Sequence, residues 1–170
     1  SDLVRLMYIP SAPLGIYSDK HGSLDDIQAG MSISLPNEPN NIPRAMMFLA
    51  ELGLITVNEG VDPEQAMDTD VTSDYELVLI DAPQIIRSMG DVDYGVSFGN
   101  HVIAAGRKLS ESFALEDPAK KYQIIITVRE DSLDATWAQD LKAAWESDEF
   151  RQFMESDPDF IGFSTPDYRR

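Results

Sequence analysis

The sequence predicts an α/β fold with a largely parallel sheet. Strand-like segments alternate with segments in which apolar residues recur at helical spacing, along nearly the whole chain. The strand-like run 122–128 contains three consecutive isoleucines. A strand that is apolar on both faces is typical of a central position between two layers of helices. With 170 residues, 43% of them apolar, the chain can bury a real core as one domain or two small lobes.

Strands are expected where apolar residues alternate or cluster between glycine, proline and polar turns. These segments are 3–9, 14–17, 31–35, 54–57, 75–80, 92–98, 122–128 and 160–164. Residues 58–74 are polar and acidic, and we expect them to form a solvated connection with a short helix near Met67.

Helices are expected where apolar residues recur at spacings of three and four. These segments are 23–30, 43–52, 83–89, 102–106, 134–146 and 148–156. Ser23 and Asp26 match a weak capping box at the start of the first helix. Gly53 provides the stop of the second helix, and Ser147 is a plausible N-cap for the last one.

The composition excludes several classes of function. Thirteen basic residues against thirty acidic ones give a formal charge of −17, which disfavours binding to nucleic acid or to an anionic membrane. The chain has no cysteine, so disulfides, thiolate metal sites and cysteine nucleophiles are excluded. Only His21 and His101 could form a histidine metal site, and we predict no metal and no cofactor. No apolar run approaches the ~18 residues of a membrane span, and we expect no signal peptide in the strand-like run that opens the given sequence.

Arg44 occupies an unusual position, in the first turn of the helix expected from residue 43. A helix N-terminus favours anions, so an arginine there makes sense if the site holds an anion such as a carboxylate. The alternative is a surface arginine paired with Glu38 or Glu51. Asn41, just before the helix, could cap it, face a ligand, or do both.

Gly99-Asn100 follows the strand expected over 92–98, at the carboxyl end where ligands collect in open α/β sheets. Asn100 offers an acceptor and a donor for a ligand, or it is simply a turn residue. His101 could act as an acid or base, but no nucleophile accompanies it at a recognisable spacing, so a hydrolase is a remote alternative. Asp91 and Asp93 could bind a metal, although acidic residues beside a strand are usually solvated.

Several stretches, taken in order, resemble the NlpA-type lipoproteins, which are the methionine-binding substrate-binding proteins of bacterial ABC importers. Each motif is weak alone, but their order and spacing fit this family along nearly the whole chain. The matching stretches are 13–18, 23–27, 35–41 with Arg44-Ala45, 91–94, 98–100, and 115–118 leading to 122–129.

The resemblance implies a periplasmic-binding-protein fold of type II, with two α/β lobes and the ligand in the cleft between them. It also implies recognition of a free amino acid, which is methionine in the characterised members. Carried over by position, Arg44 and Asn41 would bind the ligand carboxylate, and Asn100 would hold its amino or carboxylate group. Asn37, in the same stretch as Asn41, completes the candidate ligand-binding set.

The chain departs from the family pattern in three places. It has His101 where the family usually has an aromatic residue, and Asn40 where threonine is common. The family also normally has an N-terminal portion before the segment that matches residues 3–17. We therefore expect one complete lobe over 23–116. The incomplete second lobe would consist of hinge strands in 1–22 and of a return strand and helices in 117–170.

The resemblance predicts the solute-binding component of a bacterial ABC importer for methionine or a related amino acid, without enzymatic activity. Its expected partners are L-methionine, the transporter permease and a second copy bound through the exposed hinge region. Because part of one lobe is missing, we expect weak binding by this chain alone. The family implies the cell envelope, with a lipid anchor in the full-length form. The alternative is a non-transport module that acts through self-association or a partner chain.

Overall fold

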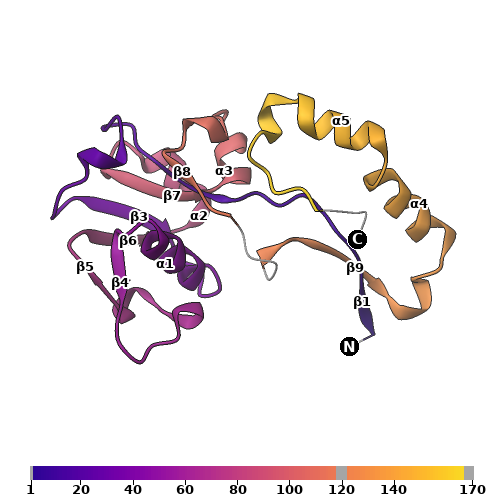
Figure 1. Ribbon diagram of the computed structural model, residues 1–170, viewed down its shortest axis with the longest axis horizontal. Helices are drawn as coiled ribbons and strands as arrows, with labels where there is room; N and C mark the ends of the chain where they lie inside the picture. The colour runs from indigo at the N-terminus through magenta and orange to yellow at the C-terminus, as the bar shows by residue number, and fades with distance from the viewer. Residues whose placement is uncertain (1, 118–121, 167–170) are drawn as a thin grey trace. The chain divides into compact units, whose positions relative to one another are not determined.

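The computed structural model describes residues 2–117 and 122–166 and divides the chain into two compact units (Figure 1). Unit 1 comprises Ser1–Pro13 and Asp117–Arg170, and unit 2 comprises Leu14–Glu116. The chain therefore crosses between the units twice, after Pro13 and after Glu116.

Unit 2 is built on a five-stranded mixed sheet with the strand order β6-β3-β7-β2-β8. β3 (Ser32–Pro36) runs parallel to β6 (Glu76–Ile80) and to β7 (Tyr94–Phe98). β2 (Leu14–Tyr17) is antiparallel to both β7 and β8 (Ala114–Leu115). The α/β class is confirmed, and its parallel core consists of three strands. β2, which the sequence analysis placed with the hinge strands, pairs within unit 2.

Helices cover both faces of this sheet. The buried side chains of α1 (Ile42–Glu51) pack on the face formed by alternate residues of β2, β3 and β7. α2 (Ala82–Ile85) and the 3-10 turn Ile86–Ser88 lie against the opposite face, where Gly95 of β7 points toward Ile85. α3 (Gly99–Ala104) follows β7 directly. It begins three residues before the expected helix 102–106, because Phe98 takes the extended N-cap position.

The connection over 58–74 is more structured than expected. β4 (Ile55–Val57) pairs antiparallel with β5 (Val71–Ser73), and two 3-10 turns, Pro63–Gln65 and Asp68–Asp70, lie between them. Ala66 is fully buried. The rest of 58–74 is exposed or half-buried, as expected for a solvated connection, and the short helix expected near Met67 takes the form of these two turns. The sequence did not predict β5, since a three-residue strand is too short to show a period.

Unit 1 contains a two-stranded antiparallel sheet of β1 (Leu3–Tyr8) and β9 (Ile125–Arg129). α4 (Thr136–Trp145) packs against one face of the pair, around Val128. The prediction that 122–128 forms a sandwiched central strand was wrong. Within the described chain β9 has one strand neighbour and helix cover on one face, so the Ile125 side chain is 42% exposed.

The C-terminal part of unit 1 contains α5 (Asp148–Ser156), whose N-terminus is capped by Ser147 as expected. The strand expected over 160–164 is not formed. Instead, Pro158–Phe160 is a 3-10 turn, and only an isolated bridge joins Ser164 to Ser11. Trp145 belongs to the core of unit 1, whereas Trp137 on the same helix is 56% exposed.

A first prediction concerns the close approach of α2 and the following turn to β7. A Cβ atom added at Gly95 would lie 2.6 Å from the Met89 sulfur and 2.9 Å from Ser34 Oγ. Because overpacking a filled core costs about 1–3 kcal/mol, Gly95→Ala should lower the free energy of unfolding by that amount in urea titrations. The matched control is Gly90→Ala, since nothing lies within 4 Å of a Cβ built at Gly90. Equal stability of the two variants would contradict this packing.

Candidate functional site

The loops that follow the three parallel strands meet at one edge of the unit 2 sheet. Asn37 follows β3, Asp81 follows β6 and Gly99 follows β7. The carboxyl edge of parallel strands is where ligands bind in open α/β sheets. The structure therefore brings all four predicted site residues, Asn37, Asn41, Arg44 and Asn100, to the segments at this edge.

The loop 37–41 is held against the start of α2. The Asn37 side-chain amide donates to Asp81 Oδ1 at 3.0 Å, and the Asn37 backbone N–H donates to the Ile80 carbonyl at 3.0 Å. Glu38 Oε1 accepts a bond of 3.4 Å from the Ala82 N–H. Asn37 thus ties the loop after β3 to the loop after β6.

Asn41 does not cap α1 with its side chain, so that interpretation was wrong. Its backbone lies in the helical region (φ −100°, ψ −24°), whereas a capping residue is normally extended. The Asn41 side-chain amide donates instead to Glu38 Oε2 at 3.4 Å. The Glu38 carbonyl accepts from the N–H groups of Asn41 and Ile42. Asn41 is half-buried at the entry to the helix.

Arg44 is buried, with 8% of the residue exposed, and pairs with Glu116. Its Nε lies 2.8 Å from Glu116 Oε1, and its Nη2 lies 2.5 Å from Oε2. The guanidinium carbon also lies 5.2 Å from the centre of the Phe98 ring, within the range of a cation–π contact. An anion therefore does sit at this helix start. The chain itself supplies this anion through Glu116, 72 residues along the sequence.

Asn100 is exposed, in the first turn of α3. His101 beside it is half-buried and packs edge-on to Phe98, with ring centres 6.3 Å apart. Phe98 thus contacts both the guanidinium of Arg44 and the residue next to Asn100. This chain of contacts links the start of α1 to the start of α3.

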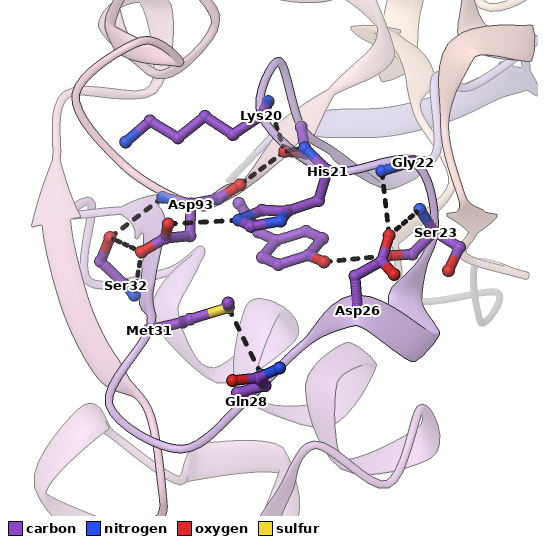
Figure 2. A network of polar contacts seen from close by, with 11 residues as sticks. Lys20, His21, Gly22, Ser23, Asp26, Gln28, Met31, Ser32 and Asp93 are labelled. Carbon is purple, nitrogen blue, oxygen red and sulfur yellow. Dashed lines mark hydrogen bonds and ion pairs between the residues drawn. The ribbon is translucent and has the colours of Figure 1, made fainter.

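A second polar cluster lies at the opposite, amino edge of the same strands, and sequence reasoning missed it (Figure 2). Asp93, just before β7, accepts bonds of 2.9 Å from both the backbone N–H and the hydroxyl of Ser32, the first residue of β3. His21 Nε2 lies 3.3 Å from the other carboxylate oxygen of Asp93. Chiefly the Ser32 N–H, and then His21, lower the pKa of Asp93 to about 2.

Ring stacking and a further hydrogen bond hold the side chains of His21 and Tyr94 and the loop around Ser23 in place. The His21 ring stacks on Tyr94, with centres 5.1 Å apart and planes at 12°. The Tyr94 hydroxyl donates to the Ser23 carbonyl at 2.8 Å. The capping box of Ser23 and Asp26 is formed as expected, but the helix that it was expected to start over 23–30 is limited to the 3-10 turn Leu24–Asp26. The cluster ties the loop before β3 to the starts of β3 and β7. We read it as structural.

Two findings bear on other classes of function. Among the described residues, no group of three or more histidine, aspartate or glutamate side chains is placed to hold a metal ion. Asp93, considered as a metal ligand from the sequence, is instead saturated by Ser32 and His21. Across residues 2–117 and 122–166, no helix combines the length and apolarity that a membrane crossing requires.

We predict that Asp93→Asn lowers the free energy of unfolding by about 1.5–3 kcal/mol at neutral pH, the range for hydrogen bonds to a charged group. Because the pKa is lower in the folded state, this stabilisation is present above the ordinary pKa near 4 and is lost as the pH falls toward 2. Urea titrations from pH 7 downward should therefore show the two proteins converging in acid. Asp91→Asn, at an exposed neighbouring carboxylate, is the control and should stay within about 0.5 kcal/mol of the parent. A deficit that does not change with pH would count against this role of Asp93.

The curated proteins that resemble this chain include two that carry the same name. The chain is 32% identical over 142 residues to the D-methionine-binding lipoprotein MetQ of Yersinia pestis, covering 81% of this chain and 52% of that protein. It is 31% identical to the protein of the same name from Escherichia coli K12, with the same coverage. The chain thus spans about half the length of these curated relatives. The printed names of both relatives describe binding of D-methionine.

Solved structures show the same fold. A nutrient binding protein from Burkholderia cenocepacia bound to methionine has a TM-score of 0.84 at 29% identity, over 96% of this chain and 70% of that one. A periplasmic substrate-binding protein of an ABC transporter from Coxiella burnetii has a TM-score of 0.83 at 27% identity, over 97% and 70%. The family model described as NlpA lipoprotein matches residues 1–165. The chain belongs to the NlpA lipoprotein family.

Proposed function

We propose that this chain is part of the solute-binding component of a bacterial ABC importer for methionine or a related amino acid. The observation that carries the proposal is a buried arginine at the start of α1, together with an exposed asparagine in the first turn of α3, at the same carboxyl edge of the sheet. The methionine-binding names of the relatives and the methionine in the Burkholderia structure support the choice of ligand. They favour import over the alternative of a non-transport interaction module.

The proposed binding is noncovalent and orients the amino acid through its α-carboxylate and α-amino groups. Arg44 and Asn41 bind the carboxylate, and Asn100 binds the amino or carboxylate group through its side-chain amide. A guanidinium has five N–H donors, so its pairing with Glu116 through Nε and Nη2 does not by itself exclude a second carboxylate. Asn37 would act by holding the loop, since its amide already donates to Asp81.

The same proposal implies a place and a partner. A lipoprotein that feeds an importer works in the cell envelope, on the extracytoplasmic side of the membrane, and delivers its amino acid to a transporter permease. The strongly acidic composition is compatible with this role because it disfavours nucleic acid as the partner. The chain spans about half the length of its curated relatives, so we expect it to offer only part of a binding surface and to bind with low affinity.

Titration with methionine, followed by amide chemical shifts, tests the ligand and its orientation. We expect weak saturable binding in the millimolar range, with shifts at Asn41, Arg44 and Asn100. Methioninol, which lacks the carboxylate, should not cause the shifts at Asn41 and Arg44, because it offers no ligand carboxylate to these two residues. Asn100→Ala should abolish the shifts at the start of α3, whereas Asn40→Ala, at another exposed asparagine, should not. Micromolar affinity would contradict the expected impairment, and equal shifts with methioninol would contradict the proposed orientation.

We further propose self-association through the exposed face of the β1–β9 sheet. Leu3 on β1 is 58% exposed and Ile125 on β9 is 42% exposed, and the register puts both on the same face of the sheet. Ile124, just before β9, is 50% exposed. Exposed apolar side chains on a strand pair favour pairing with another chain. Light scattering at tens of micromolar should give a mass above that of the monomer. Ile125→Thr keeps a β-branched residue on the strand and should shift the mass toward the monomer. A monomeric mass for the parent chain would refute self-association.

A further inference from the structure

Glu116 is the last residue of unit 2 before the chain crosses to unit 1, yet its side chain is only 6% exposed. Both of its carboxylate oxygens accept from Arg44, at 2.8 and 3.1 Å from Nε and at 2.5 Å from Nη2. A carboxylate buried to this degree is stable in its charged form only when its lone pairs are satisfied. The two side chains therefore fix each other's position.

The same carboxylate also holds the other crossing. Glu116 Oε2 accepts a bond of 3.0 Å from the backbone N–H of Leu14, the first residue of unit 2. In return, the Glu116 backbone N–H donates to the Leu14 carbonyl at 2.8 Å. Hydrogen bonds between Leu14 and Glu116 thus join the two points where the chain enters and leaves unit 2. Arg44 binds the same Glu116 carboxylate.

We propose that Glu116 is a positioning residue that sets the direction of the Arg44 guanidinium and couples ligand binding at Arg44 to both chain crossings. This inference rests on the proposed function, in which Arg44 binds the carboxylate of an amino acid. A ligand carboxylate takes a share of the positive charge of Arg44. The Glu116 carboxylate, then less neutralised, becomes a stronger acceptor for the Leu14 N–H.

A ligand-free experiment tests the positioning. Hydrogen exchange is measured at the Leu14 amide and at the Arg44 Nε–H in the parent chain and in Glu116→Gln. Both protons should exchange at least about tenfold faster in the variant, because the amide that replaces the carboxylate is a weaker acceptor. Glu111→Gln is the matched control. Glu111 lies five residues before Glu116 and also pairs with an arginine, Arg107, but this pair is exposed. Unchanged protection of Arg44 Nε–H in Glu116→Gln would overturn the proposal.

A second experiment tests the coupling. Methionine should slow exchange at Leu14 in the parent chain and in Glu111→Gln, but not in Glu116→Gln, which should also bind methionine about tenfold more weakly. Faster Leu14 exchange in Glu116→Gln with unchanged methionine affinity would mean that Glu116 only joins β2 to β8, and the coupling would be refuted. If the parent chain shows no response to methionine at all, the proposed function fails, while the ligand-free result still decides the positioning.

Loss of the buried charge could prevent folding. If Glu116→Gln gives collapsed amide dispersion, Glu116→Asp takes its place in both experiments. The shorter carboxylate keeps the charge but cannot reach Nε, Nη2 and the Leu14 N–H together. It should therefore show the same faster exchange and weaker binding, and parent-like values in both measurements would overturn the proposal.

Discussion

The structure of unit 2 depends on one buried ion pair, that between Arg44 and Glu116. A cation in the first turn of a helix is opposed by the macrodipole, and burying it adds a desolvation cost. Glu116 offsets both effects by placing a carboxylate beside the helix start, and its remaining hydrogen-bonding capacity goes to Leu14. Removing either partner of such a pair typically costs about 3–5 kcal/mol, because the other charge is left uncompensated. The contact fixes α1, the start of β2 and the end of β8 against one another.

The two edges of the parallel strands have different characters. At the amino edge, Asp93 is bonded by Ser32 and His21, which locks the starts of β3 and β7 and hence their register. At the carboxyl edge, Asn100 remains exposed while Arg44 is held in place. A site needs its polar groups in fixed directions before a ligand arrives. The hydrogen bonds at the amino edge therefore help to hold the carboxyl edge in place, since a slip of β7 against β3 would move the start of α3, where Asn100 lies.

The sequence predicts local features better than distant contacts. The capping box of Ser23, the N-cap of Ser147 and the span of α1 follow from nearby residues, and the structure confirms them. The partner of Arg44 lies 72 residues away, and local spacing does not reveal it. Local spacing indicates only nearby carboxylates, Glu38 and Glu51, as partners. The pairing of His21 with Asp93, also 72 residues apart, was missed for the same reason. Asn41 failed as a cap because its backbone is helical, which residue type alone does not reveal.

Unit 1 shows how a chain segment compensates for a thin sheet. A two-stranded sheet is marginally stable in water without a packed face, and here only the face toward α4 is covered. Aromatic rings supply the missing packing between α4, α5 and the C-terminal turn, with successive ring centres 4.7–6.4 Å apart. These rings line an apolar cavity of about 220 Å³ together with Pro10 and Met154. The buried cluster between β1, β9 and α4 is therefore not the whole apolar packing of unit 1, because the aromatic rings join the two helices and the C-terminal turn to one another.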